Sequence, residues 1–460
     1  MIGSLTRLLT NPRRRSELGL LSLGSIVVFF GYILVSLAKS DALPSHLILF
    51  VLGMVVIILA VQVVNRRYVP DADGVLMPIA LLLNGIGYIM ISRLDPTSAA
   101  QQHSAGQQLG WTFLGLIIYG IVVARIERVS DLERFRYILL LIALGLLIAP
   151  LLPVIGLNVN GARLWVHLRS LEFQPIEIAK ILLVIFFASY FIEKRELLTI
   201  STRRVGNRLV PDLRAFAPIS VAGALALMII LGEHDIGFSL LLFVVFLTML
   251  WVTTGRWTYL LIGAILFALA AFVASHLLYQ VHERVSVWLN PWRDPLQTGY
   301  QPIQGELAFG RGGLAGSGLG LGNPTAIPFY TSDFLFAGFG EELGLFGSAA
   351  IVVAYMLLVA CGIRTALRAR GEFAKICAFG FIATLGFQAF FIMAGVVRLL
   401  PLTGVTLPFV SYGGSSLIAN YALFGLLMRI SDEANKDDNQ PSTPARSMTS
   451  SATVMGTKGR

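Results

Sequence analysis

Near its C-terminal end the chain reads Pro401-Leu-Thr-Gly-Val-Thr-Leu-Pro-Phe-Val-Ser-Tyr-Gly-Gly-Ser-Ser416, between two strongly apolar runs. Two prolines and three glycines interrupt what would otherwise continue as a membrane helix. Irregular backbone at membrane depth is tolerated only where it is buried in protein or lines a cavity. We therefore predict that residues 401–416 shape an internal site rather than a surface that faces lipid.

The rest of the chain is also strongly apolar. Of its 460 residues 56% are hydrophobic and 13% are charged, with a mean hydropathy of +0.76, whereas a soluble domain carries about 25% charged residues. A span needs about 20 apolar residues, and runs of that length are too many for a soluble protein. We predict an all-α polytopic membrane protein with about 12 transmembrane helices, near 18–38, 47–64, 75–91, 109–124, 137–154, 177–192, 215–231, 236–252, 258–278, 344–363, 376–397 and 415–430.

Basic residues orient these spans. The net charge of +9 is spread over short loops between apolar runs, so it does not indicate a nucleic-acid partner. Lys and Arg concentrate after every second span, in 66–67, 125–136, 194–214 and 364–375. Because such loops face the cytoplasm, we predict a protein of the cytoplasmic membrane, in contact with membrane lipids, with both termini cytoplasmic. The polar tail, 431–460, is predicted to be disordered.

Two large loops then lie on the outer side, at about 155–176 and 279–343. Long loops in compact proteins are usually functional or disordered. These two carry aromatic residues and few runs of the disordered type, so we expect them to fold back and roof a cavity. The two cysteines lie in apolar runs and predict neither a disulfide framework nor a metal-thiolate site.

Charged residues cluster at the outer ends of spans and in these loops, which suits chemistry on a substrate presented at that face. Asp294 lies between Arg293 and Pro295, and the proline favours extended backbone at the carboxylate; the alternative is an Asp-Pro turn on a solvated loop. The glycine-rich stretch 310–322 is either a phosphate-binding loop or a flexible linker.

Three other groups also have two interpretations. Glu177 and Lys180 share one helical face. They form either a polar site or an interfacial anchor with a snorkelling lysine. The carboxylates of Asp333, Glu341 and Glu342 either belong to a site or cap a helix N-terminus, where negative charge stabilises the helix dipole. The turn 233–235 (Glu-His-Asp) is a weak metal-site candidate beside the simpler interpretation of a solvated turn.

These residues resemble a family. The segment 401–416 is similar to the C-terminal signature of the SEDS proteins (RodA, FtsW and SpoVE). The resemblance extends to Asp294-Pro with Gly299-Tyr-Gln, to Asp333-Phe with Gly340-Glu-Glu-Leu-Gly, to Phe173-Gln-Pro and to Asp235-x-Gly237. Two extra N-terminal spans, with Asn84-Gly-Ile-Gly, look most like an actinobacterial RodA type. The resemblance implies a SEDS-like core of ten spans at 75–430 that follows an N-terminal extension, 1–74, with two.

The resemblance implies that this protein is a peptidoglycan glycosyltransferase, as the family is. It would polymerise lipid II into β-1,4 glycan strands at the outer membrane face, in cell elongation and shape control. Its implied partner is a class B penicillin-binding protein, which supplies transpeptidation. A lipid II flippase and a non-catalytic scaffold for that partner remain the alternatives, although the absence of a clear internal repeat disfavours a transporter.

The resemblance places the family's catalytic aspartate at Asp294, which would act as the general base. The family's arginine and tryptophan fall on Arg163 and Trp165, with the arginine one place earlier than in the common pattern; Ile176 and Ser332 replace a serine and a threonine of the family. Mg²⁺ or Mn²⁺ bridging the phosphate oxygens is a candidate cofactor. The candidate substrate-binding residues are Arg163, Trp165, Glu177, Lys180, Arg284, Asp333, Glu342 and Arg398.

Overall fold

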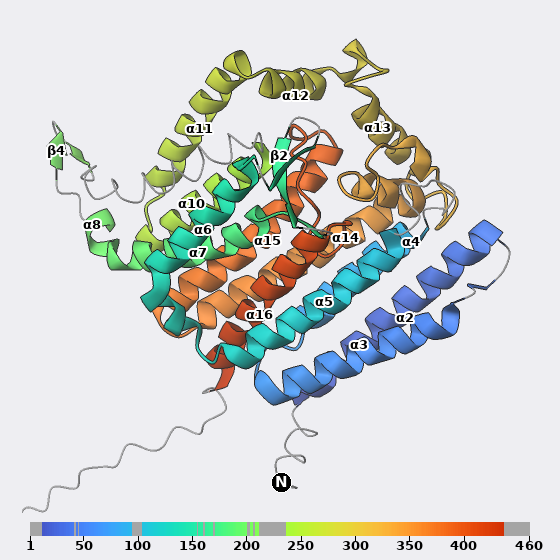
Figure 1. Cartoon of the computed structure of the whole chain (residues 1–460), viewed down its shortest axis with the longest axis horizontal. Helices are drawn as coiled ribbons and strands as arrows, with labels where there is room; N and C mark the ends of the chain where they lie inside the picture. The colour runs from blue at the N-terminus through green and yellow to red at the C-terminus, as the bar shows by residue number, and fades with distance from the viewer. Residues whose placement is uncertain are drawn as a thin grey trace, which may run out of the picture.

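Long apolar helices build most of the chain (Figure 1). The computed structural model describes residues 12–40, 43–44, 46–93, 104–153, 155–159, 162–168, 171–199, 203–205, 208–210 and 236–436. Its longer helices are α2 (Pro12–Ser40), α3 (Leu47–Tyr68), α4 (Leu76–Ser92), α5 (Ser104–Arg125), α6 (Arg136–Ile148), α7 (Ile176–Glu193), α10 (Ile236–Thr254), α11 (Thr258–Leu277), α12 (Tyr279–Leu289), α13 (Tyr300–Gly312), α14 (Leu335–Arg368), α15 (Glu372–Val396) and α16 (Gly414–Lys436). Short elements are α8 (Arg195–Thr199), η1 (Val129–Phe135), η2 (Ala149–Leu151), η3 (Pro291–Arg293) and η4 (Pro324–Ala326).

The helices confirm a multi-pass membrane protein. Within the described residues, 8 helical segments are long and apolar enough to cross a membrane. Eleven of the twelve predicted spans coincide with a described helix. The remaining span, 215–231, lies outside the described residues. The span predicted at 137–154 ends early, because the helix tightens to η2 at Pro150.

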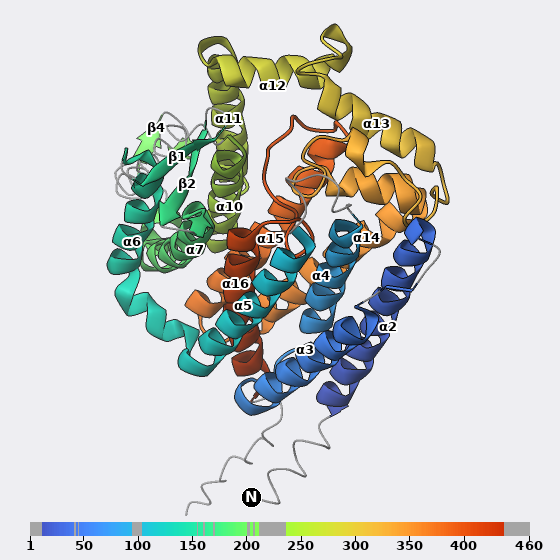
Figure 2. The same cartoon turned by 45° about the vertical axis from the view of Figure 1, so that its right-hand side comes forward.

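The core lies around α15 and α16. In α15, 78% of the apolar window is buried, against 11% in α3 and 6% in α11. Figure 2 shows α15 and α16 in the middle of the bundle, with α2 and α3 on one side. Pairs in close contact are α5 with α16, α14 with α15, α6 with α7 and α2 with α4. Helices at the edge of this bundle therefore expose their apolar side chains to lipid.

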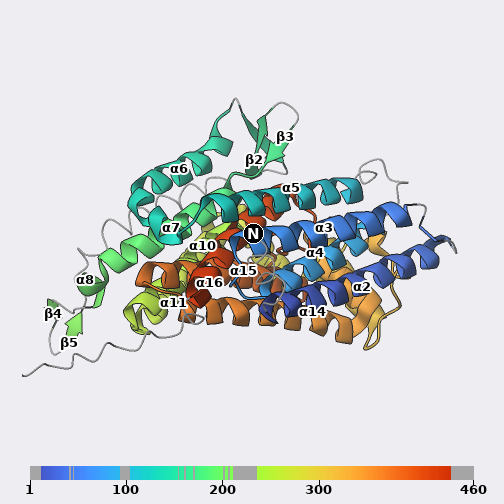
Figure 3. The same ribbon diagram turned by 90° about the horizontal axis from the view of Figure 1, so that it is seen from below.

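The two long loops contain regular secondary structure, and one departs from the all-helical prediction. Three strands form an antiparallel sheet in the order β1 (Gly156–Val159), β2 (Ala162–Leu168) and β3 (Leu171–Phe173). In β2 the buried Val166 is followed by the exposed His167, the alternation expected of a half-buried strand. Figure 3 shows β2 and β3 at one edge of the molecule. A second hairpin pairs β4 (Arg203–Val205) with β5 (Arg208–Val210).

The other loop, 279–343, is largely helical. In Figure 1, α11, α12 and α13 form an arch across the end of the bundle away from the N-terminus. The helix α12 combines apolar and polar residues in its Tyr279–Leu289 sequence, as expected of a helix that lies along an interface. This arch places residues from the loop over the ends of the membrane helices that lie opposite the chain ends.

Both described ends of the chain meet at the turn between α3 and α4. Arg14 donates hydrogen bonds to the carbonyls of Pro70 at 3.0 Å and Ala72 at 3.1 Å. Asp432 accepts one from the backbone N–H of Asp71 at 2.8 Å. The ends thus lie on one side of the bundle, as an even number of spans requires. Helix α16 runs to Lys436, beyond the boundary predicted at 430, because these contacts hold its last turns; residues 437–460 lie outside the described residues.

Candidate active site

Residues 401–413 form an irregular segment inside the bundle, as its prolines and glycines predict. Val405 and Val410 are fully buried, and α16 begins only at Gly414. Neighbouring elements satisfy its backbone: Gln388 donates to the Thr406 carbonyl at 2.9 Å, and Asn84 to that of Phe409 at 3.1 Å. Side chains from α4, α12, α14 and α15 all bind this segment, so its position fixes the helices around it.

A cavity of about 240 Å³ lies at the start of this segment. It is enclosed by α12, α13, the end of α15 and the turn before α14. Three predicted site residues line it together, namely Arg284, Asp333 and Arg398. Glu283 also lines the cavity, so the structure brings two guanidinium groups and two carboxyl groups to one hollow, at the end of the bundle opposite both chain ends.

Arg284 and Arg398 are held by backbone carbonyls. Arg284 donates to the carbonyls of Leu402 at 3.1 Å and Thr403 at 3.2 Å. Arg398 has a positive φ of 57° and ion-pairs with Glu306. The Trp288 indole donates to the Arg398 carbonyl at 3.0 Å, and the Arg398 guanidinium donates back to the Trp288 carbonyl at 3.0 Å. These bonds fasten α12 to the end of α15 and orient both cations beside the cavity.

Asp294 lies at the rim of this cavity rather than among its lining residues. It follows the short helix η3 and is half-buried. Its φ of −141° is that of extended backbone, whereas its ψ of 75° falls below the range that the following proline favours. Its Oδ2 accepts hydrogen bonds from the Thr298 amide at 3.3 Å and the Thr298 hydroxyl at 3.2 Å. Thr298 itself lines the cavity. The other carboxylate oxygen therefore remains available to a bound molecule.

Asp333 is the predicted site residue whose carboxyl group lies on the cavity wall. Burial raises the pKa of Asp333 to about 6, against the opposing effects of the Ser332 hydroxyl and the Arg284 cation. Low surrounding polarity disfavours the charged form of a carboxyl group. Asp333 thus changes charge slightly below neutral pH.

Glu177 and Lys180 lie in the helix interior, outside that cavity. Lys180 Nζ is 2.5 Å from Glu177 Oε2, and both side chains are nearly completely buried. Lys180 also donates to Gln388 at 2.8 Å and to Asn420 at 3.3 Å. Because Gln388 in turn donates to the Thr406 carbonyl, this buried pair is linked through Gln388 to the irregular segment and helps to hold it in place.

Glu342 holds the glycine-rich loop. It ion-pairs with Arg93 and accepts a hydrogen bond from the Gly320 amide at 2.9 Å. The amides of Gly316, Ser317 and Gly318 also bond to carbonyls of Gly312, Glu341 and Glu342. These internal bonds leave those amides unable to cradle a phosphate. They also exclude a flexible linker, because the loop is fastened along its length.

Gly344 makes this arrangement possible. It breaks α14 with φ 64° and ψ −161°, and a Cβ at this position would lie 2.3 Å from the Gly316 nitrogen. The break frees the amides of Leu345 and Phe346 to bond to the carbonyls of Gly313 and Leu314. The membrane-spanning part of α14 therefore begins after Gly344, where the sequence predicts it.

We expect Gly344→Ala to lower the thermal unfolding temperature of the purified protein strongly. The alanine would combine a backbone conformation that is essentially restricted to glycine, worth about 1–3 kcal/mol of strain, with a clash against the glycine-rich loop. Gly310→Ala is the matched control, because a Cβ there meets nothing within 4 Å. Equal unfolding temperatures for the two variants would contradict a structural role for the Gly344 break.

For the remaining predicted residues the structure describes only part of the position. Arg163 and Trp165 belong to β2, where Trp165 pairs with Leu157 and is half-buried. The side chain of Arg163 lies outside the described residues, as does the Glu-His-Asp turn at 233–235. Among described side chains, no group of three His, Cys, Asp or Glu residues is arranged to hold a metal ion.

Sequence reasoning missed three polar residues that the structure places in or behind the site: Thr298, Glu306 and Gln388. Thr298 lies four positions after Asp294, a spacing from which a hydroxyl reaches back to a carboxylate. Gln388 is a polar amide inside an apolar span. A search for buried amides, beside ionisable groups, would have found it.

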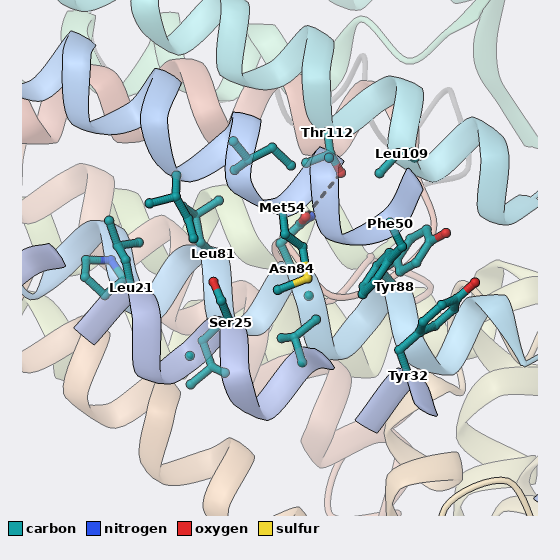
Figure 4. A pocket seen from close by; sticks show the side chains of 18 of the residues that line it. Leu21, Ser25, Tyr32, Phe50, Met54, Leu81, Asn84, Tyr88, Leu109 and Thr112 are labelled. Atoms are coloured by element: carbon teal, nitrogen blue, oxygen red, sulfur yellow. Dashed lines mark hydrogen bonds between the residues drawn. The ribbon is translucent and has the colours of Figure 1, made fainter. Parts of the chain in front are cut away.

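A second cavity, of about 140 Å³, lies among α2, α3, α4 and α5 (Figure 4). Tyr32, Phe50 and Tyr88 stack at one end, and Thr112 donates to Asn84 at 3.1 Å. No Asp, Glu, Lys or Arg is among the described residues that line it. It lacks the charged groups that a site for a phosphorylated substrate needs.

Comparison with known proteins identifies the family of this chain. Residues 74–436 match the FtsW/RodA/SpoVE family, described as "Cell cycle protein". The peptidoglycan glycosyltransferase RodA of Mycobacterium tuberculosis (strain H37Rv) is 39% identical over 429 residues, which cover 92% of this chain and 92% of that protein. The probable peptidoglycan glycosyltransferase FtsW of Geobacter sulfurreducens is 34% identical over 375 residues, 80% of this chain and 97% of that protein.

A solved structure is also similar. It comes from work on the coordination of polymerization and crosslinking by a peptidoglycan synthase complex. That chain is 28% identical, with a TM-score of 0.65, and the match covers 80% of this chain and 99% of that one.

Proposed function

Because this chain belongs to the FtsW/RodA/SpoVE family, we infer that it is a peptidoglycan glycosyltransferase. We propose that it polymerises lipid II into β-1,4 glycan strands. The observation that carries the proposal is the cavity that gathers Arg284, Asp333 and Arg398, with Asp294 at its rim. A base beside two cations suits a reaction in which a hydroxyl attacks and a pyrophosphate leaves.

We propose Asp294 as the general base. Its carboxylate takes the proton of the acceptor sugar's 4-hydroxyl as that oxygen attacks the anomeric carbon of the donor. A positioned base contributes about 10²–10⁴-fold to the rate. Thr298 holds one carboxylate oxygen, which turns the other toward the acceptor. Direct displacement inverts an α-linked donor to a β-linked product.

Arg284 and Arg398 stabilise the leaving group in this mechanism. The bond to pyrophosphate breaks with negative charge on phosphate oxygens, which guanidinium groups bind in a bidentate manner. Backbone carbonyls already orient both side chains, so little reorganisation is needed during reaction. Asp333, next to Arg284, is proposed to accept a hydrogen bond from a sugar hydroxyl.

A divalent cation fits this site only with help from the substrate. Mg²⁺ is usually held by one or two carboxylates together with substrate phosphates. Glu283 and Asp333 line the cavity and Asp294 lies at its rim, and these carboxylates would hold the ion together with the substrate. We propose Mg²⁺ or Mn²⁺ in that role, where it would neutralise phosphate charge; removal by EDTA with full retained activity would contradict it.

The raised pKa of Asp333 predicts a pH dependence with opposite signs for activity and stability. Activity should fall as the pH is lowered through about 6, because the carboxylate becomes protonated. The contribution of Asp333 to stability should instead rise as the pH is lowered through about 6. The folded state binds this proton more tightly than an unfolded chain with a pKa near 3.8, so protonation below about 6 favours the fold.

The measurement is the pH profile of polymerisation and of the unfolding temperature, for wild type and Asp333→Asn. The difference between the two proteins isolates this group from the other carboxylates. We expect the variant to lose the activity step near pH 6. Superimposable profiles would show that Asp333 does not titrate in the site.

Polymerisation in detergent tests the proposed function. Purified chain is mixed with labelled lipid II in micelles, where no bilayer exists to flip lipid across. We expect glycan strands that a muramidase degrades. A lipid II flippase, or a scaffold for a transpeptidase, would leave lipid II unpolymerised under these conditions.

The partner and the orientation are further parts of the proposal. The similar solved chain acts in a complex that couples polymerization to crosslinking. We propose that this chain likewise works with a class B penicillin-binding protein, in cell elongation, and that this partner raises the polymerisation rate. We also propose that both termini are cytoplasmic, which puts the charged cavity outside. The test fuses to the C-terminus a reporter enzyme that works only outside the cytoplasm. Activity of that reporter would contradict the proposed orientation.

A further inference from the structure

A long apolar groove separates the inner halves of α3 and α5. It has a volume of about 400 Å³ and is lined by α3 from Val56 to Tyr68 and by α5 from Phe113 to Arg125. We call this hollow the α3–α5 groove. Helix α3 lies at the edge of the bundle, and Val56, Ile117 and Ile121 are at least half exposed. The groove therefore opens toward lipid, away from the charged cavity.

The length of the α3–α5 groove matches one leaflet. Twelve residue steps separate Val56 from Tyr68, and twelve separate Phe113 from Arg125. At about 1.5 Å per residue each wall is about 18 Å long. Half of a hydrocarbon core about 30 Å thick is about 15 Å. A single acyl chain that starts at the membrane surface would fill the groove to the bilayer midplane.

The surface end of the groove is polar and cationic. Tyr68 and Arg125 are the last residues of α3 and α5, and the Arg67 guanidinium lies 5.7 Å from the centre of the Tyr68 ring. Arg125 is exposed, and within the part of the chain that the structure describes its side chain has no ion-pair or hydrogen-bond partner. Elsewhere the described groove walls are apolar apart from the buried Tyr119 hydroxyl.

We propose that the α3–α5 groove binds one anionic diacyl phospholipid, in the leaflet on the side of the chain termini. One acyl chain lies in the groove, the phosphate contacts Arg125, and the Tyr68 hydroxyl donates to a headgroup oxygen. Basic pockets between membrane helices on the cytoplasmic side favour anionic headgroups. A zwitterionic lipid fills the same groove with less attraction, because its headgroup carries no net negative charge.

The bound lipid stabilises the attachment of the N-terminal helices. The groove wall includes Tyr119, whose hydroxyl donates to Asn65 at 2.5 Å, and Asn65 donates to Glu17 on α2 at 2.6 Å. A chain packed against α3 and α5 supports the helix pair that holds these bonds. Because a ligand that binds only the folded state raises stability, the lipid raises the unfolding temperature.

The test uses the purified full chain in detergent, delipidated and then titrated with dioleoyl-phosphatidylglycerol. Native mass spectrometry counts bound lipid, and thermal unfolding reports stabilisation. Dioleoyl-phosphatidylcholine tests the headgroup, and dihexanoyl-phosphatidylglycerol tests the acyl chain. We expect the long anionic lipid to bind most tightly and to raise the unfolding temperature most.

Three variants locate the site. Arg125→Gln should weaken phosphatidylglycerol binding about fivefold, the effect of losing one cation near an anionic lipid. Ala60→Phe should block the groove from its exposed side. Arg368→Gln is the matched control, an exposed arginine at the same end of the bundle but on α14.

Equal weakening by Arg125→Gln and Arg368→Gln would overturn the proposal, because it would show only diffuse attraction to a basic face. Equal binding of the two dioleoyl lipids, or unchanged binding in Ala60→Phe, would overturn it as well. Both arginines are exposed, so these variants should fold as the wild type does.

Discussion

Replacing Asp294 by asparagine is expected to lower the rate of glycan polymerisation by about 10²–10⁴-fold, the usual contribution of a positioned general base. Asparagine keeps the shape and an oxygen that Thr298 can bind, but it cannot take a proton from the acceptor hydroxyl. The fold should be preserved, because Asp294 is half-buried and its described side-chain hydrogen bonds reach only Thr298.

The measurement is the initial rate of labelled lipid II consumption, with the unfolding temperature recorded for each protein. Thr298→Val provides a graded comparison. It removes the hydroxyl that orients Asp294 but keeps the base, so its rate should lie between those of the wild type and Asp294→Asn. A variant Asp294→Asn that folds normally and polymerises near the wild-type rate would remove Asp294 from the mechanism.

Replacing Lys180 by methionine should produce the largest loss of stability. Removing one partner of a buried ion pair typically costs about 3–5 kcal/mol, because the other charge is left unpaired. Here Glu177 would lose Lys180, and neither of its carboxylate oxygens has a hydrogen-bond partner among the described residues. Gln388 would also lose a donor, so its bond to the irregular segment would weaken.

The double variant Glu177→Gln with Lys180→Met is the control for this account. It removes both charges, so we expect it to recover much of the unfolding temperature that the single variant loses. Polymerisation should stay low in both, because the support of residues 401–416 through Lys180 is gone. If the single and double variants unfold at the same temperature, the pair does not act as a coupled buried charge.

The membrane helices could be predicted from the sequence because each is a run of apolar residues with its own local signal. The buried, irregular course of residues 401–413 followed from Pro401, Pro408 and the glycines in the same way. The sheet β1–β3 was missed, since a loop beside long apolar runs offers only the short alternation around Val166. The family resemblance, rather than spacing, supplied the role of Asp294.

Contacts between distant residues could not be predicted. Glu342 was a candidate substrate ligand until the structure placed Arg93 against it, and these residues are far apart in the sequence. Lys180 and Gln388 are separated by 208 positions, yet they form one buried network. Only the packing of α7, α15 and α16 brings such side chains together, and no local pattern encodes it.

The most direct test of the central claim is a gel of glycan products made from labelled lipid II in detergent by the purified chain alone. Wild type and Asp294→Asn are compared at equal protein concentration. Equal unfolding temperatures of the two proteins show that both are folded. We predict a ladder of strands from the wild type and unreacted lipid II from the variant. Ladders of equal intensity, or no ladder from a folded wild-type preparation, would contradict a glycosyltransferase whose base is Asp294.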